Sequence, residues 1–320
     1  MKGLTDVPGI LVGHATDSDA LTGCTAILCG NDAVGGVDVR GSATGSVELD
    51  TLHPGHVAQN VHAIVLAGGS AFGLEASCGV RRILERRGVG FNTGVAHVPI
   101  VPGAILYDLG IGKAGVRPTR EMGEKAVEAA TSAAVEEGNV GAGTGATVGK
   151  LFGMSQAMKS GVGSASLTLG SGVLVAALVV VNAVGDVIDP SVNKIIAGAR
   201  MSATSREFVD SAAALRHAAL PSPQSPGFRG NTTLAVVATN ARLDRVQTNK
   251  LAALASIGVA RTISPVNTMS DGDIVFALSL GSEQASVDSV GVAASEALAM
   301  AVLRAVRAAK TAGGIPGLAG

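Results

Sequence analysis

The sequence predicts a mixed α/β protein, on the basis of three observations. Its 320 residues are 47% hydrophobic, which is enough for a sizeable core in one large domain or two ordinary ones. Short apolar runs separated by glycine alternate along the chain with longer segments of helical spacing. Aromatic residues make up only 2% of the chain and glycines number 44, so the core must consist of small aliphatic side chains in close contact. Helices that separate runs of strands favour layered sheets with helices on the outside.

The first half of the chain is predicted to be rich in short strands. Glycine-punctuated apolar runs occupy 10–15, 24–29 and 33–41. An apolar strand at 62–70 leads into 71–88, where the apolar residues have helical spacing and the last turns are basic. A second helix is expected over 120–137.

In the second half, two apolar strands are expected at 164–169 and 173–184. The longer one falls well short of the ~20 residues that a helix needs to cross a bilayer, so we expect a buried strand. A helix at 205–219 should end at the Pro-rich loop PSPQSPGFRG. The remainder is predicted to be strand, helix, strand and helix, over 232–239, 243–257, 273–279 and 286–309.

Charge and cysteine content restrict the partners and the compartment. There are 24 Lys and Arg residues against 25 Asp and Glu, with no basic run that would favour nucleic acid or an anionic membrane surface. The N-terminal segment lacks the apolar stretch of a signal peptide, and Cys24, Cys29 and Cys78 have no metal-type spacing. We therefore expect reduced core cysteines in a cytoplasmic protein, with neither nucleic acid nor membrane as a partner.

Two glycine-rich motifs resemble nucleotide-binding loops but fail on spacing. LAGGSAFGLEA lacks G-x-G-x-x-G, and it lacks the G-x-S-x-G of esterases because Phe72 stands two residues after Ser70. GAGTGATVGKL has Thr144 where a phosphate loop needs glycine and Leu151 where it needs Ser or Thr. The six histidines show no established metal-binding spacing. The sequence thus predicts no cofactor and no metal, and Lys150 needs another explanation.

The polar pair Asn231-Thr232 stands where the Pro-rich loop meets the strand at 232–239. In a strained turn, a hydroxyl beside its preceding carbonyl can attack it, move the acyl group from nitrogen to oxygen and, after hydrolysis of the ester, cut the chain. Thr232 would then carry a free α-amine with an ordinary pKa of about 7.7 to 8.0, which can accept the proton of its own Oγ1. On the residues alone, an ordinary strand start fits as well.

Six dispersed motifs add a resemblance that covers nearly the whole chain. GNTTLAVVATNA, AGGSAFGLEA, AILYDLG, GAGTGATVGK, VVVNAVGDVID and SDGDIVFA are similar to motifs of the DmpA-type aminopeptidase and nylon-oligomer hydrolase family, in the family's order. Members of that family cut themselves before a Ser or Thr. The resemblance implies a four-layer α/β/β/α sandwich, with residues 1–320 forming a single domain that is processed into an α chain, 1–231, and a β chain, 232–320.

The same resemblance implies roles for individual residues. Thr232 matches the nucleophile, and Asn231-Thr232 the scissile bond. Asn182, in VVVNAVG, matches an amide that can donate to a tetrahedral oxyanion. Lys150 matches a lysine that would lower the proton affinity of the nucleophile or hold its Oγ1. Tyr107 is similar to a tyrosine that faces the nucleophile and could help to bind substrate or oxyanion.

Two further groups complete the predicted site. Asp271 and Asp273 flank Gly272, and alternation along an extended chain would send both carboxylates toward one neighbour, for which the freed α-ammonium of Thr232 is suited. The family pair that they match orients the nucleophile. The turn residues that resemble a pocket lining are Gly68, Gly69, Ser70 and Phe72, and such a pocket of small residues would accept a short or linear group.

We therefore expect a cofactor-free, self-processing amide hydrolase that acts on short peptides or related linear amides. The resemblance also implies a homo-oligomer, tetrameric or larger, of processed units. Two alternatives remain open from the sequence. One is an acyltransferase resembling the ornithine acetyltransferases, and the other is a binding protein of the same fold that never cleaves itself.

Overall fold

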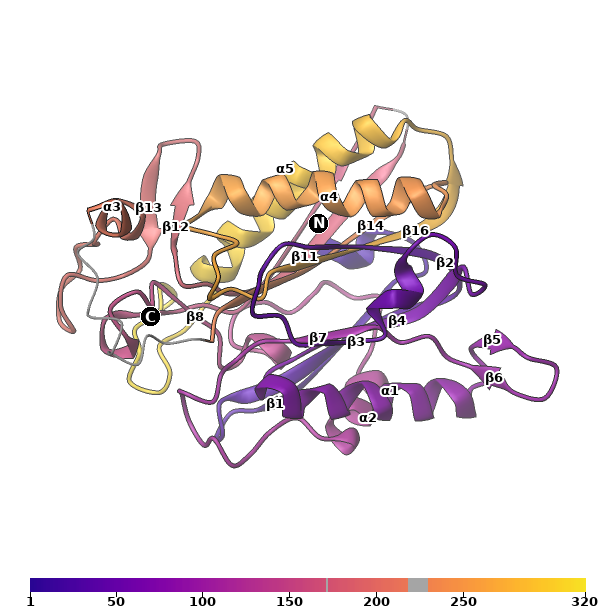
Figure 1. Ribbon diagram of the computed structural model, residues 1–320, viewed down its shortest axis with the longest axis horizontal. Coiled ribbons are helices and arrows are strands. Elements are labelled where there is room, and N and C mark those ends of the chain that lie inside the picture. The colour runs from indigo at the N-terminus through magenta and orange to yellow at the C-terminus, as the bar shows by residue number, and fades with distance from the viewer. Residues whose placement is uncertain (171, 218–229) are drawn as a thin grey trace.

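The computed structural model describes residues 1–170, 172–217 and 230–320. Within them, helices lie on both outer faces of a folded sheet (Figure 1). The helices α4 (Arg245–Thr262) and α5 (Val287–Arg307) cover one face, and α1 (Glu75–Arg86) and α2 (Arg120–Glu128) cover the other. This arrangement confirms the predicted four-layer α/β/β/α sandwich.

The described residues form one nine-stranded sheet that supplies both middle layers. Its order is β10 (Val162–Thr168), β11 (Leu174–Asn182), β14 (Thr232–Ala241), β16 (Ile274–Glu283), β2 (Thr22–Val39), β4 (Asn60–Ala67), β7 (Gly103–Ile105) and β3 (Ser46–Val47), with β1 (Leu11–Asp17) also paired to β2. The long strand β2 joins the layers, because residues 34–39 pair with β16 while residues 24–28 pair with β4. The sequence predicted two separate runs where β2 is continuous.

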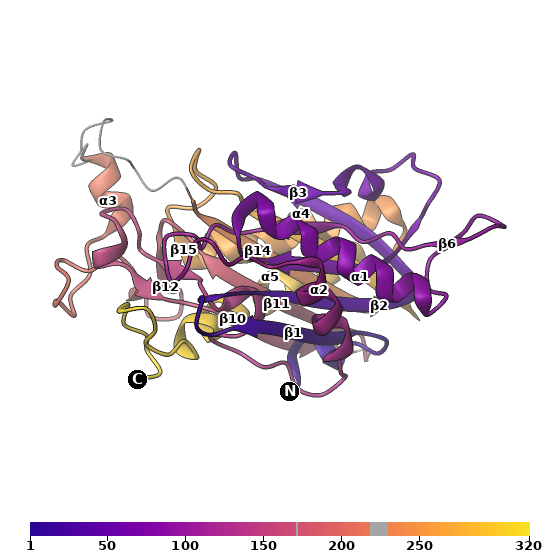
Figure 2. The same cartoon turned by 90° about the horizontal axis from the view of Figure 1, so that it is seen from below.

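Smaller elements lie at the edges of these layers. They are the three-stranded sheet β13 (Lys194–Ala197), β12 (Asp186–Asp189) and β15 (Ile263–Ser264), the hairpin β5 (Phe91–Asn92) and β6 (His97–Val98), the pair β8 (Thr147–Val148) and β9 (Met158–Lys159), and the short helix α3 (Ser211–Arg216). Figure 2 shows the β5–β6 hairpin projecting at the end of the molecule opposite to α3.

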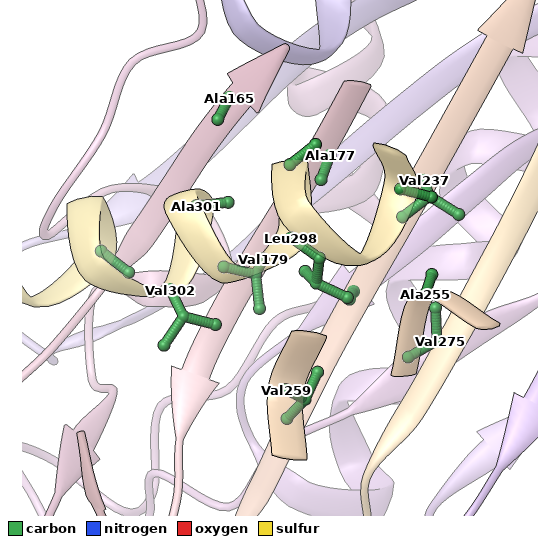
Figure 3. Close-up of a cluster of buried hydrophobic side chains, with 14 of the residues drawn as sticks. Ala165, Ala177, Val179, Val237, Ala255, Val259, Val275, Leu298, Ala301 and Val302 are labelled. Atoms are coloured by element: carbon green, nitrogen blue, oxygen red, sulfur yellow. The ribbon is translucent and has the colours of Figure 1, made fainter. Parts of the chain in front are cut away.

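Alternation along the strands produces a separate core on each side of the sheet. Val179, Val237 and Val275 face the helices, where they share a buried cluster with Leu298 and Val302 of α5 and Ala255 of α4 (Figure 3). Their neighbours in sequence belong to a second buried cluster, between the two sheet layers. A third cluster lies between the other sheet layer and the helices α1 and α2. Three clusters at three interfaces are what four layers require.

Helix α5 is the one helix among the described residues that is long and apolar enough to cross a membrane. Of its most apolar 18-residue stretch, 67% is buried inside the protein, and the helix packs against β10 and β11. Packing in the core therefore accounts for its composition.

Three sequence expectations need correction. The helix expected over 120–137 ends at Glu128, because Thr131 exchanges two backbone hydrogen bonds with Val12 at the start of β1. The helix expected over 205–219 is reduced to α3, because Phe208 forms a bridge with Arg200 before the helix begins; residues 218–229 lie outside the described part. Cys78 is exposed, whereas the other two cysteines are buried as expected.

Candidate active site

The Asn231-Thr232 junction lies at the beginning of β14, inside the protein. Thr232 is only 3% exposed and pairs with Asn182 at the end of the antiparallel strand β11. Both residues have the same strand parity as Val180 and Leu234, which belong to the cluster between the two sheet layers. Thr232 and Asn182 therefore share the inner face of the sheet, at its end.

The carbonyl group of Asn231 is held next to the hydroxyl that follows it. Its oxygen accepts the Thr232 Oγ1 hydrogen at 2.5 Å and the backbone N–H of Gly272 at 2.8 Å. Gly272 is placed there because Asn231 and Asp271 form a parallel bridge. An attack of Oγ1 on this carbonyl carbon would develop negative charge on an oxygen that already has a backbone donor.

The preceding carbonyl, that of Gly230, receives two side-chain donors. Asn182 Nδ2 lies 3.2 Å from its oxygen and Lys150 Nζ lies 3.4 Å from it. Lys150 Nζ also donates to Asn182 Oδ1 at 2.7 Å, which fixes the amide with its Nδ2 toward Gly230 and toward the carbonyl of Tyr107, 3.1 Å away. The sequence predicted that the Asn182 amide serves the oxyanion; in the intact chain it donates one residue earlier.

Lys150 reaches the junction because its own loop is tied to the end of β11. The backbone N–H groups of Gly149 and Lys150 donate to the carbonyls of Gly185 and Val184, each at 3.0 Å. Burial holds the pKa of Lys150 well below its usual range, opposed by the nearby Asp271 carboxylate. The side chain thus lies at the predicted site with its ammonium form disfavoured.

The two predicted aspartates lie beside the junction but bind different neighbours. Asp273 Oδ1 accepts the backbone N–H of Thr233 at 2.5 Å, and its Oδ2 accepts that of Asn267 at 3.0 Å. Asp271 Oδ2 accepts the backbone N–H and the hydroxyl of Thr268, at 3.0 and 2.6 Å. Burial, and then the Asp271 charge, raise the pKa of Asp273 to about 7. In the intact chain the carboxylates therefore do not converge on a single group.

The glycine-rich turn after β4 is built around Asp108. Gly69 and Ser70 both have left-handed backbone conformations, with φ of 80° and 54°. The Gly69 N–H and the Thr22 hydroxyl donate to the Asp108 carboxylate, at 2.7 and 2.6 Å. Asp108 directly follows Tyr107, so this contact connects the turn to the tyrosine that borders Gly230.

The outer residue of that turn faces solvent. Phe72 is 57% exposed, and the Arg117 guanidinium lies over its ring, 3.8 Å from the centroid. Gly68, by contrast, is buried, and its backbone N–H donates to the carbonyl of Gly23 at 2.9 Å. Of the residues predicted to line a pocket, Gly68 and Gly69 are buried, Ser70 is half-buried and Phe72 is exposed.

Sequence reasoning missed three features of this region. They are the Gly272 N–H, the Asp108 carboxylate, and Lys159, whose Nζ donates to the carbonyls of Thr144 and Ala146 at 3.0 and 2.6 Å. Asp108 stood inside the quoted motif AILYDLG and could have been considered with Tyr107. A backbone donor and a lysine in an unremarkable β-strand carry no sequence signal.

Among the residues that the structure describes, no group of three or more His, Cys, Asp or Glu side chains is placed to hold a metal ion. The carboxylate oxygens of Asp271 and Asp273 instead accept hydrogen bonds from the protein.

Comparison with known proteins gives a consistent result. The family model of peptidase family S58 matches residues 2–319. The chain is 42% identical to an uncharacterized aminopeptidase of Mycobacterium leprae (strain TN), over 99% of this chain and 93% of the relative. It is 32% identical to a 6-aminohexanoate-oligomer endohydrolase of Kocuria sp. (strain KY2), over 94% of this chain and 85% of the relative.

A solved structure supports the fold. The L-aminopeptidase D-Ala-esterase/amidase of Ochrobactrum anthropi, described as a variant of the Ntn hydrolase fold, superposes with a TM-score of 0.70 and 22% sequence identity. The match covers 96% of this chain and 86% of that one. The likeness extends over the four layers and both sides of the junction.

Proposed function

The chain belongs to peptidase family S58 and is a hydrolase, and we propose that it gains its activity by cutting its own Asn231–Thr232 bond. The observation that carries this proposal is the arrangement at the junction. The Thr232 hydroxyl donates to the oxygen of the preceding carbonyl, and the backbone N–H of Gly272 donates to the same oxygen. Residues 1–231 and 232–320 would then remain together as one processed unit, since β14 pairs with β11 across the cut.

In the cleavage step, Thr232 Oγ1 bonds to the carbonyl carbon of Asn231, and the C–N bond between the residues breaks. The Gly272 N–H stabilises the oxyanion on the way, and the nitrogen leaves as the α-amine of Thr232. Water then hydrolyses the ester to a carboxylate at Asn231. Because the Thr232 nitrogen is still an amide before this step, another group must take the hydroxyl proton and pass it to the departing nitrogen. Asp273, which accepts the N–H of the adjacent Thr233 and has a pKa raised to about 7, is suited to this role.

In turnover, the freed α-amine of Thr232 becomes the base for its own hydroxyl. Oγ1 attacks the substrate carbonyl, the amine product leaves with the transferred proton, and water releases the acyl group from the ester. Asn182 and Lys150 supply donors on the acyl side, and Tyr107 borders the same space. The carboxylates of Asp271 and Asp273 would hold the new ammonium group near Oγ1.

Short peptides and related linear amides are the proposed substrates. The relative from Kocuria hydrolyses 6-aminohexanoate oligomers by name, and the relative from Mycobacterium leprae is named an aminopeptidase. Both names describe the hydrolysis of amide bonds.

We further propose a cytoplasmic homo-oligomer of processed units. The projecting β5–β6 hairpin carries apolar side chains that face solvent in a single copy: Val95 is 95% exposed, and Phe91 and Val98 are also exposed (Figure 2). Exposed apolar groups of this kind favour association. Light scattering of the purified protein would give a mass well above 31.5 kDa, and a monomer would contradict the assembly.

Sequencing of N-termini tests the proposed function. The purified parent protein should give two chains on a denaturing gel, and the smaller should begin TTLAVV. Thr232→Ala should stay a single chain, and Thr232→Ser should still cleave because it keeps the hydroxyl. An active parent protein with only the original N-terminus would refute the proposal.

A further inference from the structure

The residues just before the cut occupy a site of their own. Gly230 lies with its carbonyl oxygen between Asn182 Nδ2 and Lys150 Nζ. Its α-carbon lies against the ring of Tyr107, where an added Cβ would come within 2.4 Å of both Cγ and Cδ1. Only a residue without a side chain fits this position.

The ester formed during self-cleavage and the acyl-enzyme formed from a substrate contain the same bond. In each, a carbonyl carbon is attached to Thr232 Oγ1, and the rest of the acyl group extends away from that atom. The Gly230-Asn231 segment is therefore the first acyl group that the site holds. Once this segment has left, Asn182, Lys150 and Tyr107 can meet the corresponding part of a substrate.

We infer that the acyl side of the site recognises a second amide carbonyl, one residue before the scissile bond, together with an unbranched carbon next to that carbonyl. The substrate class is thus an N-acylated oligoamide with glycine or a methylene group at the penultimate position, not an amide with a free α-amine at its scissile residue. The inference rests on the proposed nucleophile. It adds to that proposal what the enzyme selects.

The electrostatics of the subsite agree with this class. Two donors converge on one neutral carbonyl, and a positively charged α-amine in place of that carbonyl would face the same two donors. The carboxylates of Asp271 and Asp273 accept backbone N–H groups and, in the proposed function, attract the α-ammonium of Thr232 rather than an amine of the substrate. A carbonyl is the group that satisfies both donors.

Three p-nitroanilides test the inference with the processed parent protein. They are acetyl-Gly-Asn-, acetyl-Ala-Asn- and Asn-p-nitroanilide, which copy the chain's own segment, add one methyl group, or remove the second carbonyl. We expect kcat/KM to fall about tenfold or more for the alanine compound because of overpacking against Tyr107. A loss of about tenfold is expected for the free amine, which lacks the hydrogen-bonded carbonyl.

A complementary change in the protein separates this steric cause from others. Tyr107→Ala should bring the ratio of kcat/KM for the glycine and alanine compounds close to one, whereas Tyr107→Phe, which keeps the ring, should retain the ratio of the parent. Because the ratio is taken within each variant, a general loss of activity does not affect it. Equal efficiency for both compounds in the parent, or a preference for the free amine, would overturn the inference.

Self-cleavage gives a second measurement that needs no substrate. Gly230→Ala should slow the appearance of the 232–320 fragment about tenfold or more, and the Tyr107→Ala change should recover part of the rate. Full-speed cleavage by Gly230→Ala would overturn the inference. If no fragment forms in the parent at all, the proposed nucleophile fails instead, so the two failures are distinguishable.

Discussion

Two buried lysines show how similar surroundings can serve different ends. Lys150 and Lys159 are 2% and 0% exposed, and burial lowers the pKa of each. Lys159 Nζ donates to two carbonyls of the glycine-rich loop and so holds that loop against β9. Lys150 Nζ reaches across to Asn182 and to the Gly230 carbonyl beside the cut. Burial is common to both lysines, so the hydrogen-bond partners of Nζ distinguish the structural lysine from the one at the cleavage site.

The largest effect should come from exchanging each lysine for methionine. Lys150→Met removes the partner that orients Asn182 and a donor to the Gly230 carbonyl beside the cut. Because buried acceptors are then left unpaired, we expect self-cleavage to slow on the order of 10³-fold. Lys159→Met should cleave within about tenfold of the parent rate, since within the described residues its Nζ donates to the carbonyls of Thr144 and Ala146 and not to a group of the junction. Fragment yield over time on a denaturing gel gives both rates, with circular dichroism to establish folding. Equal losses in the two variants would contradict the distinction between the lysines.

A smaller effect is expected from removing the backbone donor at the scissile carbonyl. Glycolic acid in place of Gly272, introduced by translation with an acylated tRNA, exchanges only the N–H for an ester oxygen. The lost hydrogen bond to the Asn231 oxygen should slow cleavage about 10²-fold. The same exchange at Gly170, which is remote from the junction in sequence and exposed, serves as the control. An unchanged rate would mean that another donor stabilises the oxyanion.

The pH dependence of cleavage should report the ionisation of Asp273. Its pKa is raised to about 7, and only the ionised carboxylate can accept the hydroxyl proton. The ionised fraction grows as the pH rises toward 7 and is nearly complete above it. The cleavage rate should rise about tenfold per pH unit below 7 and level off above it. Asp271 and Lys150 also act on this carboxyl group, and Asp273→Asn separates its contribution from theirs. A parent rate that does not change between pH 5 and pH 8 would exclude Asp273 as the proton acceptor.

The smallest effect is the change in folding stability with pH, which tests the structural role of Lys159. Burial lowers its pKa from 10.5 to about 7, so the folded state binds fewer protons than the unfolded state between these values. The free energy of unfolding should therefore rise with pH across this window, on the order of a few kcal/mol. In Lys159→Met that contribution is absent. Urea denaturation of both proteins at pH 7 and pH 9.5 measures it, and parallel pH responses would contradict the assignment.

Apolar runs and helical spacing are local signals, and they predicted the individual strands and helices, whereas the four-layer arrangement came from the resemblance to the family. The C-terminal strands and helices were placed within a few residues, since β14 and β16 begin as continuous buried runs and the buried residues of α5 recur with helical spacing. The exact ends of some elements depend on tertiary pairing, which the local sequence pattern does not contain. The second helix stops because Thr131 pairs with Val12, a residue more than one hundred positions earlier.

In the candidate site, too, some residues could be predicted from the sequence and others could not. Thr232, Asn182 and Lys150 came from motifs, and the structure brings them together at the end of two neighbouring strands. The Gly272 N–H could not be found from a side-chain pattern, because a backbone donor is available at any residue except proline. The division of donors between two successive carbonyls depends on distances that a motif does not contain.

Mass spectrometry of the denatured protein during turnover tests the central claim most directly. With acetyl-Gly-Asn-p-nitroanilide, acid-quenched samples should show the 232–320 fragment carrying one acetyl-Gly-Asn group, mapped to Thr232 and absent when substrate is exhausted. Hydrolysis by a chain in which the Asn231–Thr232 bond is still intact, or an acyl group on any other residue, would contradict the account.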